Sequence, residues 1–149
     1  MHSIIKNSGD VNIQQQYGGI YPSNGLPSYK LKRPTFIIAN TDPYGKPGKH
    51  WVAFYFPRRG PAEFFDSTGH PPSKLNKNFA KFLKKNSKKY VYNKNRLQGV
   101  GSSTCGPFVM YYVLNRGKGV PMNKIIDKFD KRDLKQNDVF VSDWIERVV

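Results

Sequence analysis

The only cysteine in this 149-residue sequence, Cys105, lies between small residues and an apolar run in QGVGSSTCGPFVMYYVL, residues 98–114. The apolar run predicts a buried helix that begins near Cys105, and the positive end of a helix dipole stabilises a thiolate. Small residues before the cysteine would let backbone N–H groups turn toward one point, as an oxyanion requires. They are Gly99, Gly101, Ser102 and Ser103. Cys105 is therefore a candidate nucleophile, and the alternative is a buried cysteine that only packs.

A nucleophilic cysteine needs a base and a group that orients the base. Of the three histidines, His2 is terminal, and His70 lies in the turn-like stretch STGHPP, which favours a surface position. His50 directly precedes the strand-like WVAFYF, and Asp66 directly follows AEFF, so a hairpin would bring both side chains to one edge. Glu63 is the rival acid, but it starts its strand and would lie farther from His50. The alternative for Asp66 is an ordinary turn aspartate in DSTG.

The elements that must position these residues form an α+β pattern without repeats or long linkers. Segments rich in aromatic and β-branched residues predict strands at 35–40, 50–56, 62–66 and 90–93. Helical spacing predicts a basic amphipathic helix at 73–89, the buried helix from Cys105 to Gly117, a helix begun by Pro121 and a last helix that carries Trp144. Residues 17–31, rich in Gly, Pro, Ser and Asn, predict a turn-filled surface segment. We expect one domain over residues 1–149.

The charge balance is strongly basic, with 25 Lys and Arg against 10 Asp and Glu and a net charge of +15. Such a charge attracts polyanions, and nucleic acid is the expected partner, bound through phosphates without sequence preference. The alternative is a solvated basic face. The densest basic run comprises Lys81, Lys84, Lys85, Lys88 and Lys89. Zinc-ligand spacings, a membrane span and a signal peptide are absent from the sequence, so we expect no metal, no membrane and an intracellular protein.

The order His50, Asp66, Gln98, Cys105 resembles the adenain-like (adenovirus-type) cysteine proteases, which share a superfamily with proteases specific for SUMO and other ubiquitin-like proteins. The resemblance rests on HW at a strand start, on D-S-x-G and on Q-x6-C-G. It extends to GGIYPSNGLP, PMNKII and NDVFVSDWIERVV, and so covers nearly the whole chain. The step from Gln98 to Cys105 is similar to that of adenain, whereas an aspartate at position 66 is similar to the ubiquitin-like-protein proteases.

The resemblance implies a permuted papain-like fold, in which a small mixed sheet packs against helices and the nucleophile starts a buried helix. It implies that Cys105 is the nucleophile, that His50 is the general base and later the acid, and that Asp66 fixes the imidazole. It also implies that Gln98 donates a side-chain N–H to the oxyanion together with the backbone N–H of Cys105. Loss of one such donor costs roughly 3 kcal/mol of transition-state stabilisation. Without the resemblance, Gln98 would be interpreted as a solvated loop residue.

Trp51 is interpreted as a core aromatic residue and, by the resemblance, also as one wall of a narrow substrate cleft. Gly106 leaves no side chain beside the sulfur. The resemblance therefore implies cleavage after small residues, at sequences of the type Gly-Gly-X or Gly-X-Gly. The chain itself carries YGGI at Gly18 and Gly19, for which turn glycines are favoured over a self-cleavage site.

The function that we expect is that of a monomeric viral maturation protease, acting on virion precursor proteins or polyproteins in the virion and host nucleus. Viral double-stranded DNA is a candidate activator because of the net charge. The lone cysteine disfavours the disulfide-linked peptide cofactor of adenain, which leaves a non-covalent activating peptide as a candidate partner. Two alternatives stay open. One is a deconjugating protease for ubiquitin-like proteins, and the other is a non-enzymatic basic nucleic-acid-binding protein.

Overall fold

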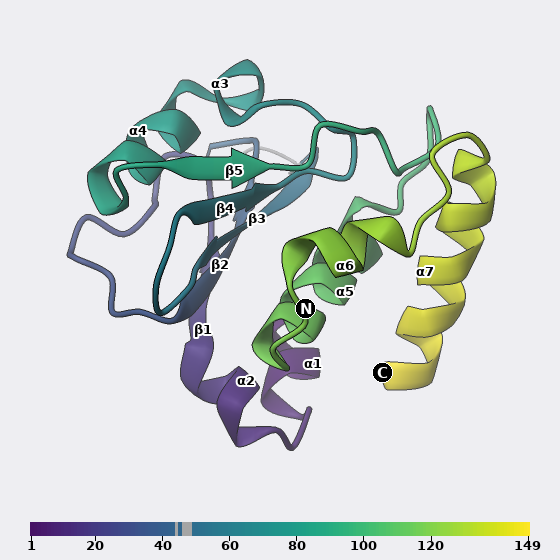
Figure 1. Ribbon diagram of the computed structural model, residues 1–149, viewed down its shortest axis with the longest axis horizontal. Helices are drawn as coiled ribbons and strands as arrows, with labels where there is room; N and C mark the ends of the chain where they lie inside the picture. The colour runs from purple at the N-terminus through teal and green to yellow at the C-terminus, as the bar shows by residue number, and fades with distance from the viewer. Residues whose placement is uncertain (44, 46–48) are drawn as a thin grey trace.

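A five-stranded mixed sheet forms the centre of the computed structural model, which describes residues 1–43, 45 and 49–149 (Figure 1). The strands lie in chain order: β1 (Tyr17–Tyr21), β2 (Thr35–Asn40), β3 (Trp51–Phe56), β4 (Ala62–Phe65) and β5 (Tyr90–Tyr92). The pairs β2–β3 and β3–β4 are antiparallel, whereas β1–β2 and β4–β5 are parallel. The expected α+β class with a small mixed sheet is confirmed, as are the four predicted strands.

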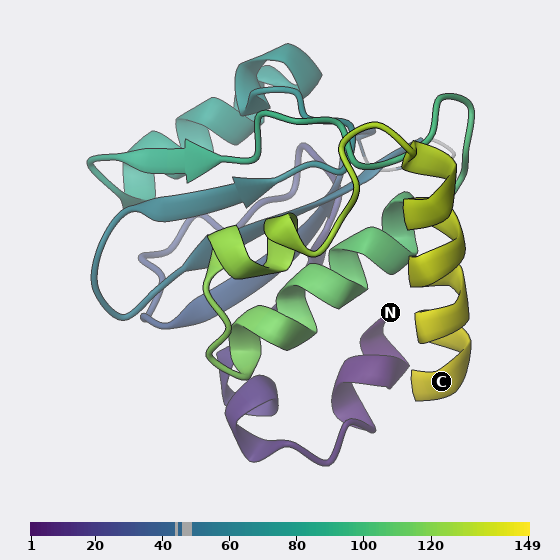
Figure 2. The same cartoon turned by 45° about the vertical axis from the view of Figure 1, so that its right-hand side comes forward.

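Helices cover both faces of this sheet, because the central strands are apolar on both sides. One face packs against α1 (His2–Lys6), α2 (Val11–Gln16), α5 (Cys105–Gly117), α6 (Met122–Asp127) and α7 (Leu134–Val148) (Figure 2). The other face carries α3 (Pro72–Leu75) and α4 (Lys77–Asn86). Strand alternation divides β2 between the two cores, since Phe36 and Ile38 face α5 while Ile37 and Ala39 face α4. The central strands are therefore packed against helices on both faces of the sheet.

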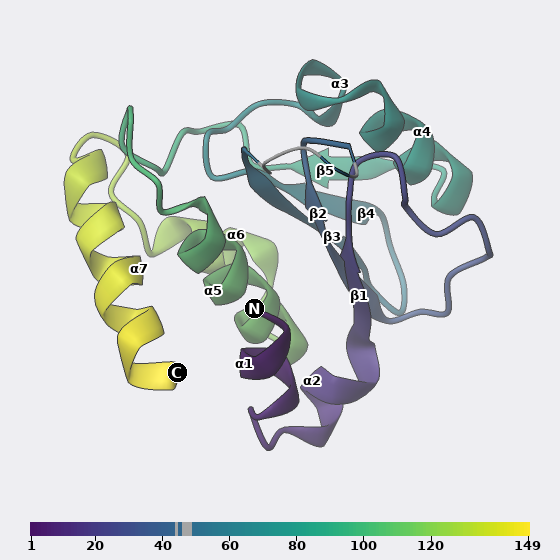
Figure 3. The ribbon, with the colours of Figure 1, turned by 180° about the vertical axis from the view of Figure 1, so that it is seen from behind.

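The expectation of a turn-filled segment over residues 17–31 is wrong for its first five residues, which form the edge strand β1. Figure 3 shows β1 continuing directly from α2. The strand tolerates two glycines because its register with β2 shifts between Tyr17 and Ile20. Gly19 has φ +108°, and a Cβ on Gly18 would lie 2.8 Å from the Thr35 hydroxyl oxygen. The glycine pair thus belongs to a strand irregularity, not to a turn.

The single amphipathic helix expected over residues 73–89 is also wrong, because the segment is broken at Asn76 into α3 and α4. Asn76 has extended backbone angles, and its side chain accepts a hydrogen bond from the Asn78 backbone N–H. An asparagine in this position is a favourable N-cap, so it starts a new helix in place of continuing the old one. The basic face of α4 remains as predicted.

The helices after β5 follow the sequence prediction closely, whereas α1 and α2 were not predicted. Helix α5 begins at Cys105, and the chain leaves it through Gly119, which has φ +96°. The segment between β2 and β3 lies partly outside the described residues, which omit 44 and 46–48. None of the helices in the described part of the chain is long and apolar enough to cross a membrane.

The start of β3 and the end of β4 lie at one edge of the sheet, and α5 packs against these two strands. His50 immediately precedes β3, and Asp66 immediately follows β4. These strands are antiparallel with Ala53 opposite Phe65, so the start of β3 and the end of β4 lie together. Helix α5 packs on β3 and β4, where the ring of Tyr112 stacks on that of Phe65 at 4.6 Å between centroids. The fold thereby brings the candidate catalytic side chains together at this edge.

Candidate active site

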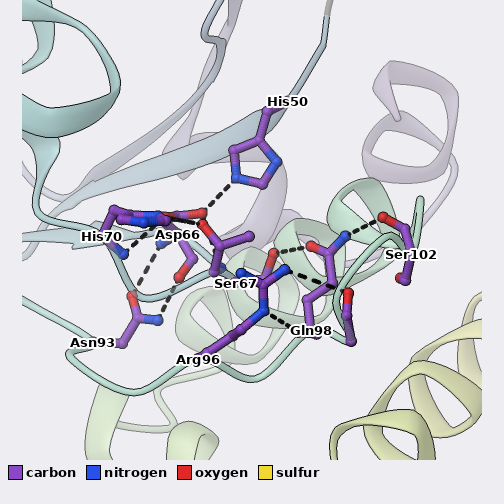
Figure 4. Close-up of polar contacts among 10 residues, drawn as sticks. His50, Asp66, Ser67, His70, Asn93, Arg96, Gln98 and Ser102 are labelled. Atoms are coloured by element: carbon purple, nitrogen blue, oxygen red, sulfur yellow. Dashed lines mark hydrogen bonds and ion pairs between the residues drawn. The ribbon is translucent and has the colours of Figure 1, made fainter.

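His50 and Asp66 are joined by a short hydrogen bond, with 2.5 Å between His50 Nε2 and Asp66 Oδ1 (Figure 4). The Asp66 side chain is fully buried, whereas 17% of the His50 side chain is exposed. The same imidazole lies close enough to the Cys105 thiol for each group to shift the pKa of the other. Thiol, imidazole and carboxylate therefore form one chain of contacts.

Several further donors hold the Asp66 carboxylate. It accepts hydrogen bonds from the Thr68 backbone N–H at 3.0 Å, from the Thr68 hydroxyl at 2.6 Å and from the His70 backbone N–H at 3.0 Å. Burial raises the pKa of Asp66, but the hydrogen bonds from His50 and Thr68 outweigh it and leave that pKa below its usual value. Asp66 is therefore an ionised acceptor at neutral pH, as an imidazole partner requires.

The backbone of Asp66 is fixed by Asn93, which follows β5. The Asn93 side chain accepts from the Asp66 backbone N–H at 3.0 Å and donates to the Asp66 backbone oxygen at 2.5 Å. Asn93 is buried, so both bonds are shielded from water. Sequence reasoning did not single out this residue, although a polar residue at the end of a predicted strand was an available indication.

The pKa values of the thiol and imidazole move in the directions that favour an ion pair. For Cys105, burial raises the pKa, but hydrogen bonding to His50 and to the Trp51 and Gly106 backbones outweighs it, so the pKa lies below its ordinary value. For His50, burial lowers the pKa, whereas hydrogen bonds to Asp66 and Cys105 raise it to about 9. A thiolate is thus stabilised at the start of α5, the position where the helix dipole also favours negative charge.

Gln98 is buried and lies beside Ser67, the residue that follows Asp66. Its Oε1 accepts from the Ser67 hydroxyl at 2.6 Å, and its Nε2 donates to the Ser102 backbone oxygen at 2.7 Å (Figure 4). The Ser67 backbone oxygen also accepts from the backbone N–H groups of Leu97 and Gln98, at 2.8 and 3.0 Å. These contacts fix which way the amide points. A primary amide has two N–H donors, of which Ser102 engages one.

Gly106 and Trp51 are neighbours in the structure. A Cβ on Gly106 would lie 3.9 Å from Trp51 Cδ1, and the half-buried indole packs partly against the core beneath α5. The Trp51 backbone lies near the Cys105 sulfur and contributes to lowering the pKa of that thiol. The indole therefore stands beside the first turn of the helix that carries the thiol.

His70 and the rival acid, Glu63, have different surroundings. His70 is half-exposed, but its Nδ1 lies 2.9 Å from the Thr68 hydroxyl oxygen and 3.5 Å from Asp66 Oδ2. His70 is therefore a neighbour of the Asp66 carboxylate, which its position in a predicted surface turn did not indicate. Glu63 pairs with Arg116 and Tyr112 at the other end of α5. Glu63 is thus engaged away from the thiol.

The five lysines of the basic run are all exposed, on α4 and the segment that follows it. Helix α4 covers the face of the sheet opposite α5. One of the five, Lys85, donates to the Ser28 backbone oxygen at 2.5 Å. The basic run therefore forms a surface separate from the thiol.

A buried carboxylate, an imidazole and a thiol at a helix start, beside an oriented amide, make up the arrangement used by cysteine proteases. One sequence comparison agrees with this class. Over 97 residues the chain is 37% identical to a protein of Acanthamoeba polyphaga mimivirus named "Putative thiol protease", and the match covers 60% of this chain. The resemblance to cysteine proteases that the sequence suggested is confirmed.

The match covers 32% of the mimivirus protein, so the chain spans about a third of the length of this curated relative. Among solved structures, a crystal structure of an ASFV protease is 26% identical and superposes with a TM-score of 0.46, covering 74% of this chain and 44% of its own. The central domain of an uncharacterised Legionella pneumophila protein gives 11% identity and a TM-score of 0.46, with 94% and 97% covered. No protein-family model matches the sequence.

Proposed function

We propose that this protein is a cysteine endopeptidase. The observation that carries the proposal is the contact chain from Asp66 through His50 to Cys105, with a thiol pKa below and an imidazole pKa above their ordinary values. Perturbed pKa values in one contact chain are a feature of active sites. The similarity to the mimivirus protein supports the same class.

In the proposed reaction, His50 takes the proton of the Cys105 thiol, and the thiolate attacks the carbonyl carbon of the scissile bond. The Gln98 side chain and the Cys105 backbone N–H donate to the resulting oxyanion. His50 then gives its proton to the departing amine, which leaves a thioester. A water molecule, deprotonated by His50, attacks that thioester, and the carboxylic acid product departs as the thiol is restored.

The proposed substrates are extended chains with glycine beside the scissile bond, as in Gly-Gly-X and Gly-X-Gly. The closeness of Trp51 to Gly106 supports this preference, because a substrate side chain would compete with the indole for space. A Trp51→Ala variant should therefore lose selectivity between Gly-Gly and Gly-Ala substrates. The measurement is the ratio of their kcat/KM values. An unchanged ratio would show that Trp51 does not restrict the substrate cleft.

The proposed setting is viral protein maturation in the virion and host nucleus, with DNA or a non-covalent peptide as an activator. The net charge of +15 and the five exposed lysines support a polyanionic partner. If several phosphates are contacted, DNA affinity should fall by orders of magnitude between low and physiological salt. Binding that is undetectable or insensitive to salt would argue against DNA as a partner. The same charge favours the second candidate function, a basic nucleic-acid-binding protein without enzymatic activity.

A thiol-reactive vinyl sulfone that carries Gly-Gly separates the two candidates. The protease should be labelled at Cys105 near neutral pH, and His50→Ala should be labelled more slowly. A cysteine that only packs should be labelled poorly. Absence of labelling in the wild type, both with and without DNA, would reject the protease.

Digestion of a peptide library followed by mass spectrometry would then define the cleavage sites, with Cys105→Ala as the inactive control. Cleavage of short Gly-Gly peptides would support an endopeptidase that processes precursor chains. Cleavage confined to folded ubiquitin-like conjugates would support the deconjugating alternative instead.

A further inference from the structure

Asp138 on α7 accepts hydrogen bonds from three residues of the loop that precedes Cys105. The Thr104 hydroxyl donates to its Oδ1 at 2.7 Å, and the Ser102 hydroxyl donates to the same oxygen at 3.1 Å. The Gly99 backbone N–H lies 3.2 Å from Oδ1 and 3.1 Å from Oδ2. One carboxylate, more than thirty residues away in sequence, thus holds the loop near both ends.

The approach of this carboxylate depends on Gly99. A Cβ on Gly99 would overlap Asp138 Oδ2, so any larger residue there would push the carboxylate away. The neighbouring residue on α7, Asn137, is buried and donates to the Leu97 backbone oxygen at 3.0 Å. Two consecutive residues of α7 therefore hold the chain on either side of Gln98.

The anchored loop connects the two groups proposed to bind the oxyanion. Gln98 is at one end, and the backbone N–H of Cys105 is at the other. The Gln98 amide donates to Ser102, which is itself bound to Asp138. Two glycines lie in between, and Gly101 has φ +78°, so the free loop would sample many backbone conformations. Without the anchor, the loop would be held by the Gln98–Ser102 hydrogen bond and by the contacts of Arg96 with the backbone oxygens of Gln98 and Gly99, so the distance between the two donors would vary more.

We propose that Asp138 is a positioning residue that sets the geometry of the oxyanion site through this loop. The inference rests on the proposed function, since an oxyanion forms only in acyl transfer. Asp138 itself contacts the loop and not the thiol or imidazole. Its removal should therefore affect oxyanion stabilisation while leaving the reactivity of the thiol unchanged.

The test compares Asp138→Ala and Asp138→Asn with Asp143→Asn, a control on an exposed carboxylate of the same helix. In Asp138→Ala, kcat on a Gly-Gly peptide should fall by about 10²-fold, the effect of a misplaced oxyanion donor, with KM changed by less than about threefold. Asp138→Asn keeps one oxygen for the Thr104 and Ser102 hydroxyls, so its loss should be smaller. Alkylation of Cys105 by iodoacetamide should stay within about twofold of wild type in all three variants.

Gly99→Ala provides a second, independent route to the same effect, because its methyl group displaces the carboxylate. It should lower kcat as Asp138→Ala does. In Asp138→Ala the clash is gone, so the double variant should be hardly worse than either single one. Strongly additive losses would indicate that Gly99 and Asp138 act separately.

Hydrogen exchange of the backbone amides at 99–104 measures the anchor without any activity assay. We expect faster exchange there in Asp138→Ala than in Asp143→Asn, with exchange in α5 unchanged. Unchanged exchange, or a loosened loop with full kcat, would overturn the inference, and so would an equal fall in alkylation and kcat. A wild type without peptidase activity would reject the proposed function and the catalytic role together, whereas the exchange result would still decide whether Asp138 anchors the loop.

Discussion

Glu63 and Arg116 form a two-pronged ion pair between β4 and the last turn of α5. Arg116 donates from Nε to Oε1 and from Nη2 to Oε2, both at 2.9 Å, and the Tyr112 hydroxyl donates to the same carboxylate. The Arg116 guanidinium also lies 4.3 Å from the centroid of the Tyr55 ring. This cluster fixes the end of α5 that is remote from Cys105.

Glu63→Ala should destabilise the fold by about 3–5 kcal/mol, because it leaves the buried guanidinium without its partner. Chemical denaturation monitored by tryptophan fluorescence would measure the loss. The control is Asp127→Ala, which breaks an exposed pair with Lys131 at 4.0 Å and should cost less than about 0.5 kcal/mol. If the two variants were equally stable, the cluster would not hold α5.

Asp66→Asn should lower kcat by about 10²- to 10⁴-fold, because an amide can no longer hold the imidazole in the required tautomer. The steady-state rate on a Gly-Gly peptide provides the measurement. Circular dichroism should show a folded protein. A variant that keeps more than about a tenth of the wild-type kcat would contradict the role proposed for Asp66.

The alkylation rate of Cys105 should rise with pH through a midpoint below the ordinary pKa of a cysteine thiol, because contacts with His50 and the Trp51 backbone stabilise the thiolate. In His50→Ala the imidazole contribution is lost, so the midpoint should move to higher pH and the rate at pH 7 should fall. Iodoacetamide kinetics between about pH 5 and pH 10 would reveal the shift. Superimposable profiles would show that the imidazole does not act on the sulfur.

The peptidase rate should fall as pH rises through about 9, the pKa of His50. Above that pH the imidazole has lost the proton that the departing amine needs. The pH dependence of kcat/KM measures this limb. A rate that stays constant well above pH 9 would argue against His50 as the proton donor.

Gln98→Ala should lower kcat by about 10²- to 10³-fold through loss of an oxyanion donor, while iodoacetamide alkylation stays near the wild-type rate. Ser67→Ala should have a smaller effect in the same direction, because it frees the amide that Ser67 orients. Gln15→Ala, at an exposed position, is the matched control. Full kcat in Gln98→Ala would leave the amide without the proposed role.

Much of the fold could be predicted because the central strands and most of α5 are buried, so their sequences are largely apolar. The strand β1 could not be predicted, since its stability comes from parallel pairing with β2 and its glycines suggest a turn. Helices α1 and α2 have five and six residues, too few for a clear helical period. The break at Asn76 was hidden because α3 and α4 both carry lysines.

The candidate site divides in the same way. The meeting of His50 and Asp66 could be predicted, because it follows from one hairpin and the order of residues along it. The supporting contacts of Asn93 and Asp138 could not, since they join side chains to distant backbone or loop atoms that leave no periodic pattern in the sequence. Such contacts depend on tertiary packing and appear only in coordinates.

The adjacency of Asp66 and Ser67 has a consequence for any attempt to re-engineer this protein. Asp66 hydrogen-bonds the His50 imidazole and Ser67 hydrogen-bonds the Gln98 amide, so a single dipeptide positions both side chains. Shifting the turn by one residue to alter proton transfer would also retune the amide, and neither property could be tuned alone. Designers who transplant this chemistry would have to move the dipeptide intact, together with the two strand ends that flank it.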